Sequence, residues 1–143
     1  MPTRSTDSSA WYRVLAETAP DAIITMDEHS VILSVNSATE RIFGYTADEL
    51  IGKKMDILMP ERMRERHHAG VSRYLRTGER YINWTSVSLP GLTKSGVEIP
   101  LEVSFGEFNN GVTRIFSGFL RDISEMTRQE ELLKEAALAL ELA

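Results

Sequence analysis

Hydrophobic and polar residues alternate most clearly between residues 98 and 108. Ile99, Leu101, Val103 and Phe105 are apolar there, and the residues between them are polar, small or proline. Successive side chains of a β-strand point to opposite faces of the sheet, so this period of two places the four apolar side chains on one face. The segment therefore predicts a strand with one buried face and one solvated face.

Other runs of β-branched, aromatic and aliphatic residues also predict strands. The polar residues 27–30 separate the first two of these runs, which is typical of a hairpin. The pair Asn110-Gly111 precedes the last run and is a strong signal for a tight hairpin turn. The predicted strands outside residues 98–108 lie at residues 22–26, 31–35, 84–89 and 112–120.

Helical spacing of apolar residues predicts helices before, between and after these strands. Asn36 or Ser37 can cap one helix and Gly44 can end it, while Thr46 and Glu49 have the spacing of a capping box for the next. The predicted helices cover about residues 11–19, 37–43, 47–51, 60–76 and 122–143.

The order of these elements predicts an α+β fold. Two strands, a helical crossover and three strands suit a five-stranded antiparallel sheet with short helices on one face, flanked by N- and C-terminal amphipathic helices. The serine- and threonine-rich start is expected to be a disordered N-terminal tail at residues 1–10. One domain is then expected at residues 11–121, and a separate helix at residues 122–143.

Composition narrows the class of protein further. The 143 residues suit a single domain with a real core, and the net charge is -5. The chain has no cysteine, which excludes disulfides, thiolate metal sites and covalent flavin–cysteine photochemistry. No apolar run approaches the roughly 20 residues that span a bilayer, and the start lacks the apolar stretch of a signal peptide. We therefore expect a cytoplasmic location and no membrane segment.

Nucleic-acid binding and catalysis are both disfavoured. Arginines gather between residues 62 and 80, but glutamates at positions 61, 65 and 79 interrupt them, which is typical of a solvated helix face. The chain shows no Gly-x-Ser-x-Gly elbow, no His-Glu-x-x-His pair and no phosphate-binding glycine loop. The sequence therefore predicts a protein that is not an enzyme and has no nucleic-acid partner.

Several short motifs, in a fixed order over about residues 12–125, together resemble the PAS domain with its C-terminal PAC segment. Each motif is weak alone, and the resemblance lies in their number and order. They are Pro20-Asp21-Ala22-Ile23, Asn36-Ser37-Ala38 followed by Phe43-Gly44-Tyr45, Glu49-Leu50-Ile51-Gly52, Lys94-Ser95-Gly96, Glu98-Ile99-Pro100-Leu101-Glu102-Val103-Ser104, and Gly118-Phe119-Leu120-Arg121-Asp122-Ile123-Ser124-Glu125.

This resemblance implies a sensory module of signal transduction, including two-component systems. In PAS domains the sheet curves around a pocket, a ligand or cofactor reshapes it, and the change passes through the C-terminal helix to an effector such as a histidine kinase. A ligand-free module that only mediates dimerisation and protein interaction is the alternative. Any catalytic activity would then belong to an effector domain that follows residue 143.

The C-terminal helix has the pattern of a coiled coil. Met126, Leu133 and Leu140 are seven residues apart, and Ala136 falls at the intervening position. Such a narrow apolar stripe buries little surface without a partner. The sequence therefore predicts a homodimer through the terminal helices, with packing of this helix on its own sheet as the alternative.

The segment Arg64-Glu65-Arg66-His67-His68, which runs on to Ser72-Arg73-Tyr74, resembles the oxygen-sensing haem PAS domains of nitrogen-fixation histidine kinases. In those domains the histidine that matches His67 binds the haem iron, and the arginine that matches Arg73 contacts a propionate. The helical period independently places His67 within about 20° of Tyr74, on the apolar stripe, and His68 at its edge.

The haem resemblance is partial, and other occupants of the pocket stay open. Val87 stands where those sensors carry a distal arginine, and Tyr81 replaces a histidine that contacts a propionate. His67 could instead be a core residue, and Phe43, Phe105 and other aromatic residues could line a pocket for a different small molecule or fill it. The cofactor is thus unknown, and the candidate binding residues are Met63, His67, Arg73, Tyr74, Trp84, Val103 and Phe116, with His67 as the metal ligand if haem binds.

Overall fold

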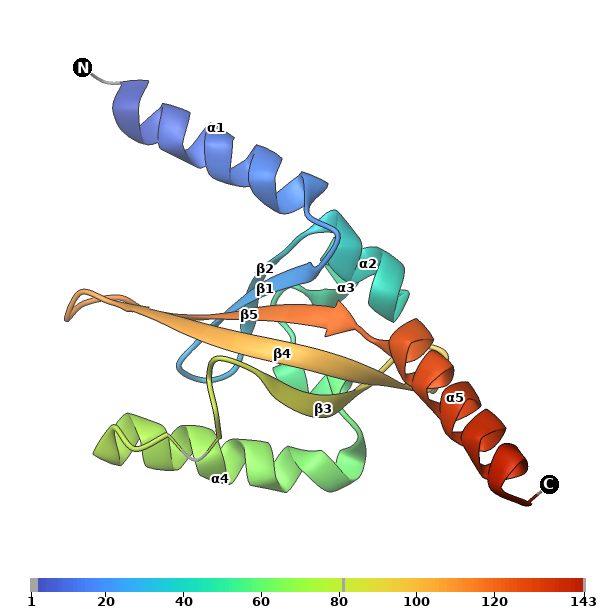
Figure 1. Ribbon diagram of the computed structural model, residues 1–143. Helices are drawn as coiled ribbons and strands as arrows, with labels where there is room; N and C mark the ends of the chain where they lie inside the picture. Colours follow the sequence, from blue (N-terminus) through green and yellow to red (C-terminus); the bar gives the residue numbers. More distant parts are fainter. Residues whose placement is uncertain (1–2, 81, 143) are drawn as a thin grey trace.

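A five-stranded antiparallel sheet in the order β2-β1-β5-β4-β3 forms the centre of the molecule (Figure 1). The computed structural model describes residues 3–80 and 82–142. The sheet confirms the predicted α+β class. Its strands are β1 (Ala22–Asp27), β2 (Ile32–Val35), β3 (Val87–Leu92), β4 (Glu98–Asn109) and β5 (Arg114–Asp122).

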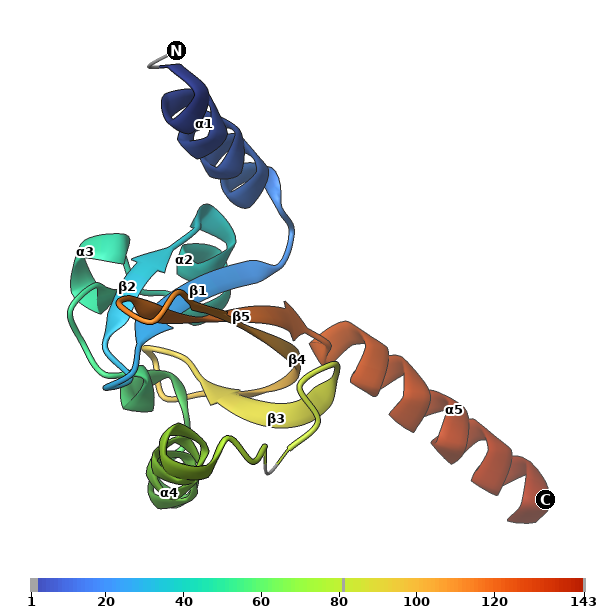
Figure 2. The same ribbon diagram turned by 90° about the vertical axis from the view of Figure 1, so that its left-hand side faces the viewer.

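The segment between β2 and β3 is helical, and Figure 2 shows its helices on one side of the sheet. Of the two N-cap candidates for the first helix, Asn36 is the cap and accepts a hydrogen bond from the Thr39 amide, and Gly44 ends the helix in the left-handed conformation at a φ of 81°. Thr46 and Glu49 form the capping box. The helices are α2 (Ser37–Phe43), α3 (Ala47–Leu50), the 3-10 turn η1 (Met55–Leu58) and α4 (Glu61–Thr77).

The apolar face of β4 forms much of the core, as its alternation predicts. Leu101 and Val103 are 3% and 4% exposed, and both pair with neighbours on β3 and β5. These side chains pack against apolar residues from the other strands and from the helices. The buried core consists of Ala22, Ile24, Ile32, Phe43, Leu50, Leu58, Leu101, Val103 and Leu120.

Strand β3 lies further along the chain than the sequence predicts. The predicted run starts at Trp84, but the strand begins at Val87 and continues through Pro90 and Gly91. An edge strand tolerates Pro90 because one side of it needs no ladder hydrogen bond. Gly91 is closely packed, since an added Cβ atom would lie 2.5 Å from Cδ1 of Leu101 and 3.1 Å from the Phe43 ring. Tertiary packing therefore decides this strand's position.

The chain begins and ends in helices that project from the sheet, α1 (Thr3–Thr18) and α5 (Ser124–Leu142) (Figures 1 and 2). Helix α1 takes up most of the segment predicted as a disordered tail, because no proline or glycine interrupts residues 3–18. Helix α5 begins two residues later than predicted, because β5 continues to Asp122. Within the described residues, no helix combines the length and apolar character needed to cross a membrane.

Candidate ligand-binding cavity

A cavity of about 210 Å³ lies between helix α4 and the concave face of the sheet. Its walls are almost entirely apolar, with four methionines at positions 26, 55, 59 and 63. Ligand pockets typically combine apolar walls with a few polar groups that orient the ligand. The lining residues that carry polar side chains are Arg66, His67, Tyr74, Arg80, Trp84 and Ser117.

Helix α4 turns His67 toward the cavity, as the helical period predicts. Its burial lowers the pKa of the imidazole below the ordinary value of 6.5, because a charged ring would lose its hydration there. The nearby carboxylate of Asp56 opposes this effect, and His68 adds to it. His67 is therefore neutral near pH 7.

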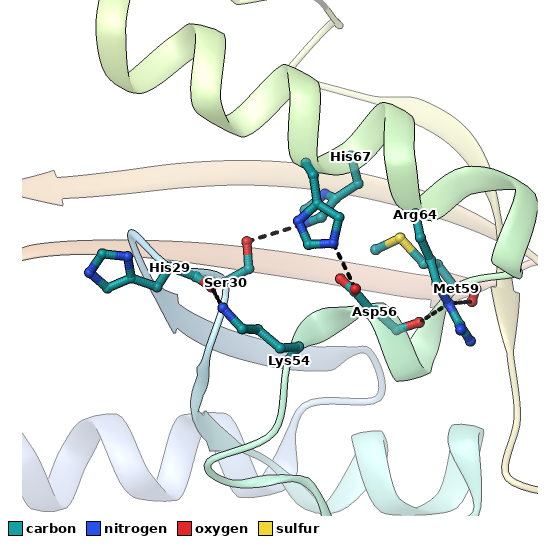
Figure 3. A network of polar contacts seen from close by, with 8 residues as sticks. His29, Ser30, Lys54, Asp56, Met59, Arg64 and His67 are labelled. Atoms are coloured by element: carbon teal, nitrogen blue, oxygen red, sulfur yellow. Dashed lines mark hydrogen bonds and ion pairs between the residues drawn. The ribbon is translucent and has the colours of Figure 1, made fainter.

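The turn between β1 and β2 provides the polar partner of His67 (Figure 3). The Oγ atom of Ser30 lies 3.2 Å from the Nε2 atom of His67. Ser30 is 3% exposed and adopts a positive φ of 63°, which is uncommon for a residue with a side chain. Its amide donates to the Asp27 carbonyl, and its own carbonyl accepts from the Met55 amide. The backbone of Ser30 is thus held on both sides.

A second group of polar contacts anchors the start of α4 to η1 (Figure 3). The Nε atom of Arg64 donates to the backbone carbonyl of Asp56 at 3.0 Å. The Nε2 atom of His68 lies 2.7 Å from the Oδ2 atom of Asp56, at the half-exposed edge of the helix. On the neighbouring turn, Lys54 donates to the His29 carbonyl. The contacts of Arg64 and His68 hold the helix end from which His67 projects.

An aromatic cluster forms the far wall of the cavity. The ring centroids of Tyr74 and Trp84 lie 5.0 Å apart, and Phe105 and Phe116 each approach Trp84 within 6.3 Å. The hydroxyl of Tyr74 donates to Glu107, which Arg114 also contacts at 2.7 Å. Because this hydroxyl already has a partner within the protein, Tyr74 contributes chiefly its ring to the cavity.

Six of the seven candidate binding residues lie together around this cavity: Met63, His67, Tyr74, Trp84, Val103 and Phe116. The exception is Arg73, which points to solvent and forms an ion pair with Glu79 at 2.8 Å. The expectation that Arg73 helps to hold a cofactor therefore does not match its position. Helical phase does not separate it from Arg66, which lies seven residues earlier on nearly the same face, so the partner Glu79 accounts for its position at the surface.

The other residues considered for the pocket lie in different places. Phe105 lines the cavity, whereas Phe43 is fully buried in the core beside Gly91. Val87 is the first residue of β3 and packs against the core. The position of the propionate-contacting histidine, Tyr81, lies outside the described residues.

Sequence reasoning missed four polar residues at the site, Ser30, Arg66, Arg80 and Ser117. Ser30 lies in a polar turn that carried no signal beyond the hairpin. Arg66 and Arg80 line the cavity, although the pattern of their arginine-rich segment predicted a solvated helix face. Helical phase gives no signal for Arg66, because it lies about 100° from His67 and on nearly the same face as the surface residue Arg73.

Comparison with known proteins shows which family the chain belongs to. The family model described as the PAS fold matches residues 10–123. The chain belongs to the PAS family. This PAS domain is similar to the PAS domain of an HTR-like protein from Haloarcula marismortui, with a TM-score of 0.69, 22% identity, and coverage of 85% of this chain and 97% of that one.

Two curated relatives of this PAS domain are a sensor protein and a histidine kinase. The sensor protein FixL of Bradyrhizobium diazoefficiens is 37% identical over 123 residues, which cover 86% of this chain and 24% of FixL. The cell-division control histidine kinase PdhS of Brucella ovis is 29% identical over 132 residues, covering 87% of this chain and 12% of PdhS. The chain thus spans a quarter or less of these relatives, and corresponds to a signal-sensing, regulatory segment rather than a catalytic one.

Proposed function

We propose that this PAS domain senses a small apolar ligand in the cavity under helix α4 and relays its binding to helix α5. The main support is the cavity itself, which has apolar walls and a small set of convergent polar groups. Its volume of about 210 Å³ is below the roughly 300–1,000 Å³ of pockets for drug-sized ligands, so a small molecule suits it best.

Strand β5 supports the relay, because it lines the cavity and leads into α5. Phe116, Gly118 and Leu120 contribute to the cavity wall, and the strand ends at Asp122. The Oδ1 atom of Asp122 accepts a hydrogen bond from the Ser124 amide at the start of the helix. A ligand that displaces the wall of β5 would therefore act on the first turn of α5.

Binding of a neutral compound, 4-phenylbutan-1-ol, tests both parts of this proposal. Calorimetry is expected to show binding to the wild type, and hydrogen exchange in residues 122–142 is expected to change when the alcohol is bound. A Val71→Phe variant fills the cavity and should lose binding. Val112→Phe is the matched control, since Val112 is 93% exposed. Absence of binding by both this alcohol and an anionic analogue of it contradicts the sensor, and binding without a change in α5 contradicts the relay.

Haem is a second candidate occupant, favoured by one observation. A neutral imidazole against apolar walls has the chemistry of an axial iron ligand, and His67 has that character. His67 would hold the iron once its Nε2 atom leaves Ser30, and Met63, Tyr74 and Trp84 would surround the macrocycle. When bound, haem would supply an iron that responds to redox state or to a gas. The cavity of about 210 Å³ would have to widen for a macrocycle, and the position of Arg73 and the presence of Val87 argue against the binding mode of the nitrogen-fixation sensors.

Absorption spectroscopy with haemin tests this second candidate. Haem binding predicts a sharp Soret band at one haem per chain that is lost in His67→Ala. His29→Ala is the matched control, because the His29 side chain is 73% exposed. A broad spectrum like that of free haemin in the wild type would rule haem out and leave His67 as a polar residue of the cavity wall.

The exposed terminal helices also support a proposal about the oligomeric state, and the curated relatives support one about the effector. Helix α5 has no buried residue among those described, and its leucines are exposed. Residues of α1, including Trp11 and Leu15, are similarly uncovered. A second copy of the chain would cover such surfaces, which supports a homodimer through the terminal helices. The relatives support an effector such as a histidine kinase.

A further inference from the structure

Two arginines stand at the solvent edge of the cavity. Arg66 comes from helix α4 and Arg80 from the loop after it, and both side chains are exposed while lining the cavity. Other arginines of this region are engaged, Arg62 with Glu98 and Arg73 with Glu79. Among the described residues, no ion pair or side-chain hydrogen bond engages Arg66 or Arg80.

The charge of the residues that line the cavity is opposite to that of the molecule. The chain carries a net charge of -5, yet the cavity lining contains two arginines and no aspartate or glutamate. His67, the other titratable nitrogen base in the lining, is neutral near pH 7. Two cations at the mouth of an apolar space attract a ligand that is apolar at one end and anionic at the other.

The aromatic wall orients one of these cations. The guanidinium carbon of Arg80 lies 4.0 Å from the ring centroid of Trp84, so the charged group stacks on the side chain that also forms the cavity wall. Stacking restricts the guanidinium while leaving its N–H donors free at the edge of the plane. Arg80 is therefore held in place as a donor at the cavity mouth.

We propose that the cavity binds an apolar carboxylate, with the carboxylate at Arg66 and Arg80 and the aryl or alkyl part among the aromatic rings and methionines. This inference rests on the proposed function and names the chemical class of its ligand. A guanidinium suits a carboxylate because both are planar and the hydrogen bond is charge-assisted.

A pair of compounds that differ only in charge tests the inference. The carboxylate 4-phenylbutyrate and the neutral 4-phenylbutan-1-ol are titrated by calorimetry at pH 7. We expect the carboxylate to bind about tenfold more tightly or better, as one charge-assisted contact would give. Raising the salt concentration should weaken binding of the carboxylate and leave the alcohol unchanged.

Arginine variants locate the source of this preference. The double variant Arg66→Gln/Arg80→Gln should lose the preference for the carboxylate and keep its affinity for the alcohol. Arg73→Gln is the matched control, because Arg73 lies on the same helix but outside the cavity. Thermal melting confirms that each variant is folded, which we expect because all three side chains are exposed.

The outcomes separate this inference from the proposed function. Equal affinity for the two compounds, binding of the alcohol alone, or a preference that survives in the double variant overturns the carboxylate proposal and leaves the sensor intact. Failure of both compounds to bind overturns the carboxylate proposal and the small-ligand sensor together.

Discussion

Asn36 joins three elements through one buried side chain. Its Oδ1 atom accepts from the amides of Ile23 and Thr39, and its Nδ2 atom donates to the carbonyls of Ala16 and Asp21. The residue therefore caps α2 and also fixes the end of α1 and the start of β1. At 2% exposure, water cannot replace these bonds.

Asn36→Ala is expected to lower the free energy of unfolding by about 2–4 kcal/mol. Loss of the helix cap accounts for roughly 1 kcal/mol, and backbone groups left without partners in the interior account for the rest. Urea denaturation measures the change. Thr46→Ala is the control, because it removes a cap at an exposed site and should cost only about 1 kcal/mol. Equal losses in the two variants would contradict the buried role of Asn36.

His67 is expected to make stability depend on pH. Burial lowers the pKa of its imidazole below 6.5, so the unfolded chain takes up a proton more readily than the folded chain. The free energy of unfolding should therefore be undiminished above pH 6.5 and should fall as the pH decreases from there toward the folded-state pKa. Urea denaturation at several pH values between about 5 and 8 measures this slope.

Comparison of two histidine variants shows whether His67 causes this dependence of the free energy of unfolding on pH. His67→Gln should flatten it between pH 6.5 and 5, because glutamine does not titrate. His29→Gln should leave it unchanged, since His29 is exposed. A slope that persists in full in His67→Gln would show that another group causes it.

At the scale of an element, strand β4 offers adjacent positions on opposite faces of the sheet. Val103 is buried in the core, whereas Ser104 pairs with the half-exposed Phe119 on the outer face. Val103→Asp should prevent folding, because a carboxylate in the apolar core has no partner. Ser104→Asp should fold and melt cooperatively. Circular dichroism during thermal melting distinguishes the two, and a cooperative transition in Val103→Asp would contradict the observed register.

At the scale of the whole molecule, the terminal helices leave apolar side chains uncovered. Leu133 and Leu140 of α5 are 71% and 79% exposed. If α5 pairs with a second chain, Leu133→Asp/Leu140→Asp should convert a dimer into a monomer, because charges in a coiled-coil seam are costly. Light scattering after size-exclusion chromatography measures the mass. Glu135→Gln is the control, and an oligomer unchanged by the double substitution would contradict pairing through α5.

Local patterns in the sequence determined most of the secondary structure and the face of each strand. The alternation in residues 98–108 predicted the buried face of β4, and Asn36, Gly44 and Thr46 predicted their caps, because these signals depend on residues close in the chain. The helical period likewise predicted that His67 faces inward. The predicted start of the first helix differs from the structure, in which α1 begins at Thr3. The polar composition of residues 3–10 suggested a disordered tail, but these residues include no proline or glycine that would break a helix.

Only the tertiary structure decided how the cavity is composed. The contact between Ser30 and His67 joins residues 37 positions apart, and Arg80 reaches the cavity from a loop through its stacking on Trp84. Arg73 and Arg66 look equivalent in the sequence, yet one pairs with Glu79 at the surface and the other lines the cavity. Such choices depend on which segments meet in space, and no short-range pattern carries that information.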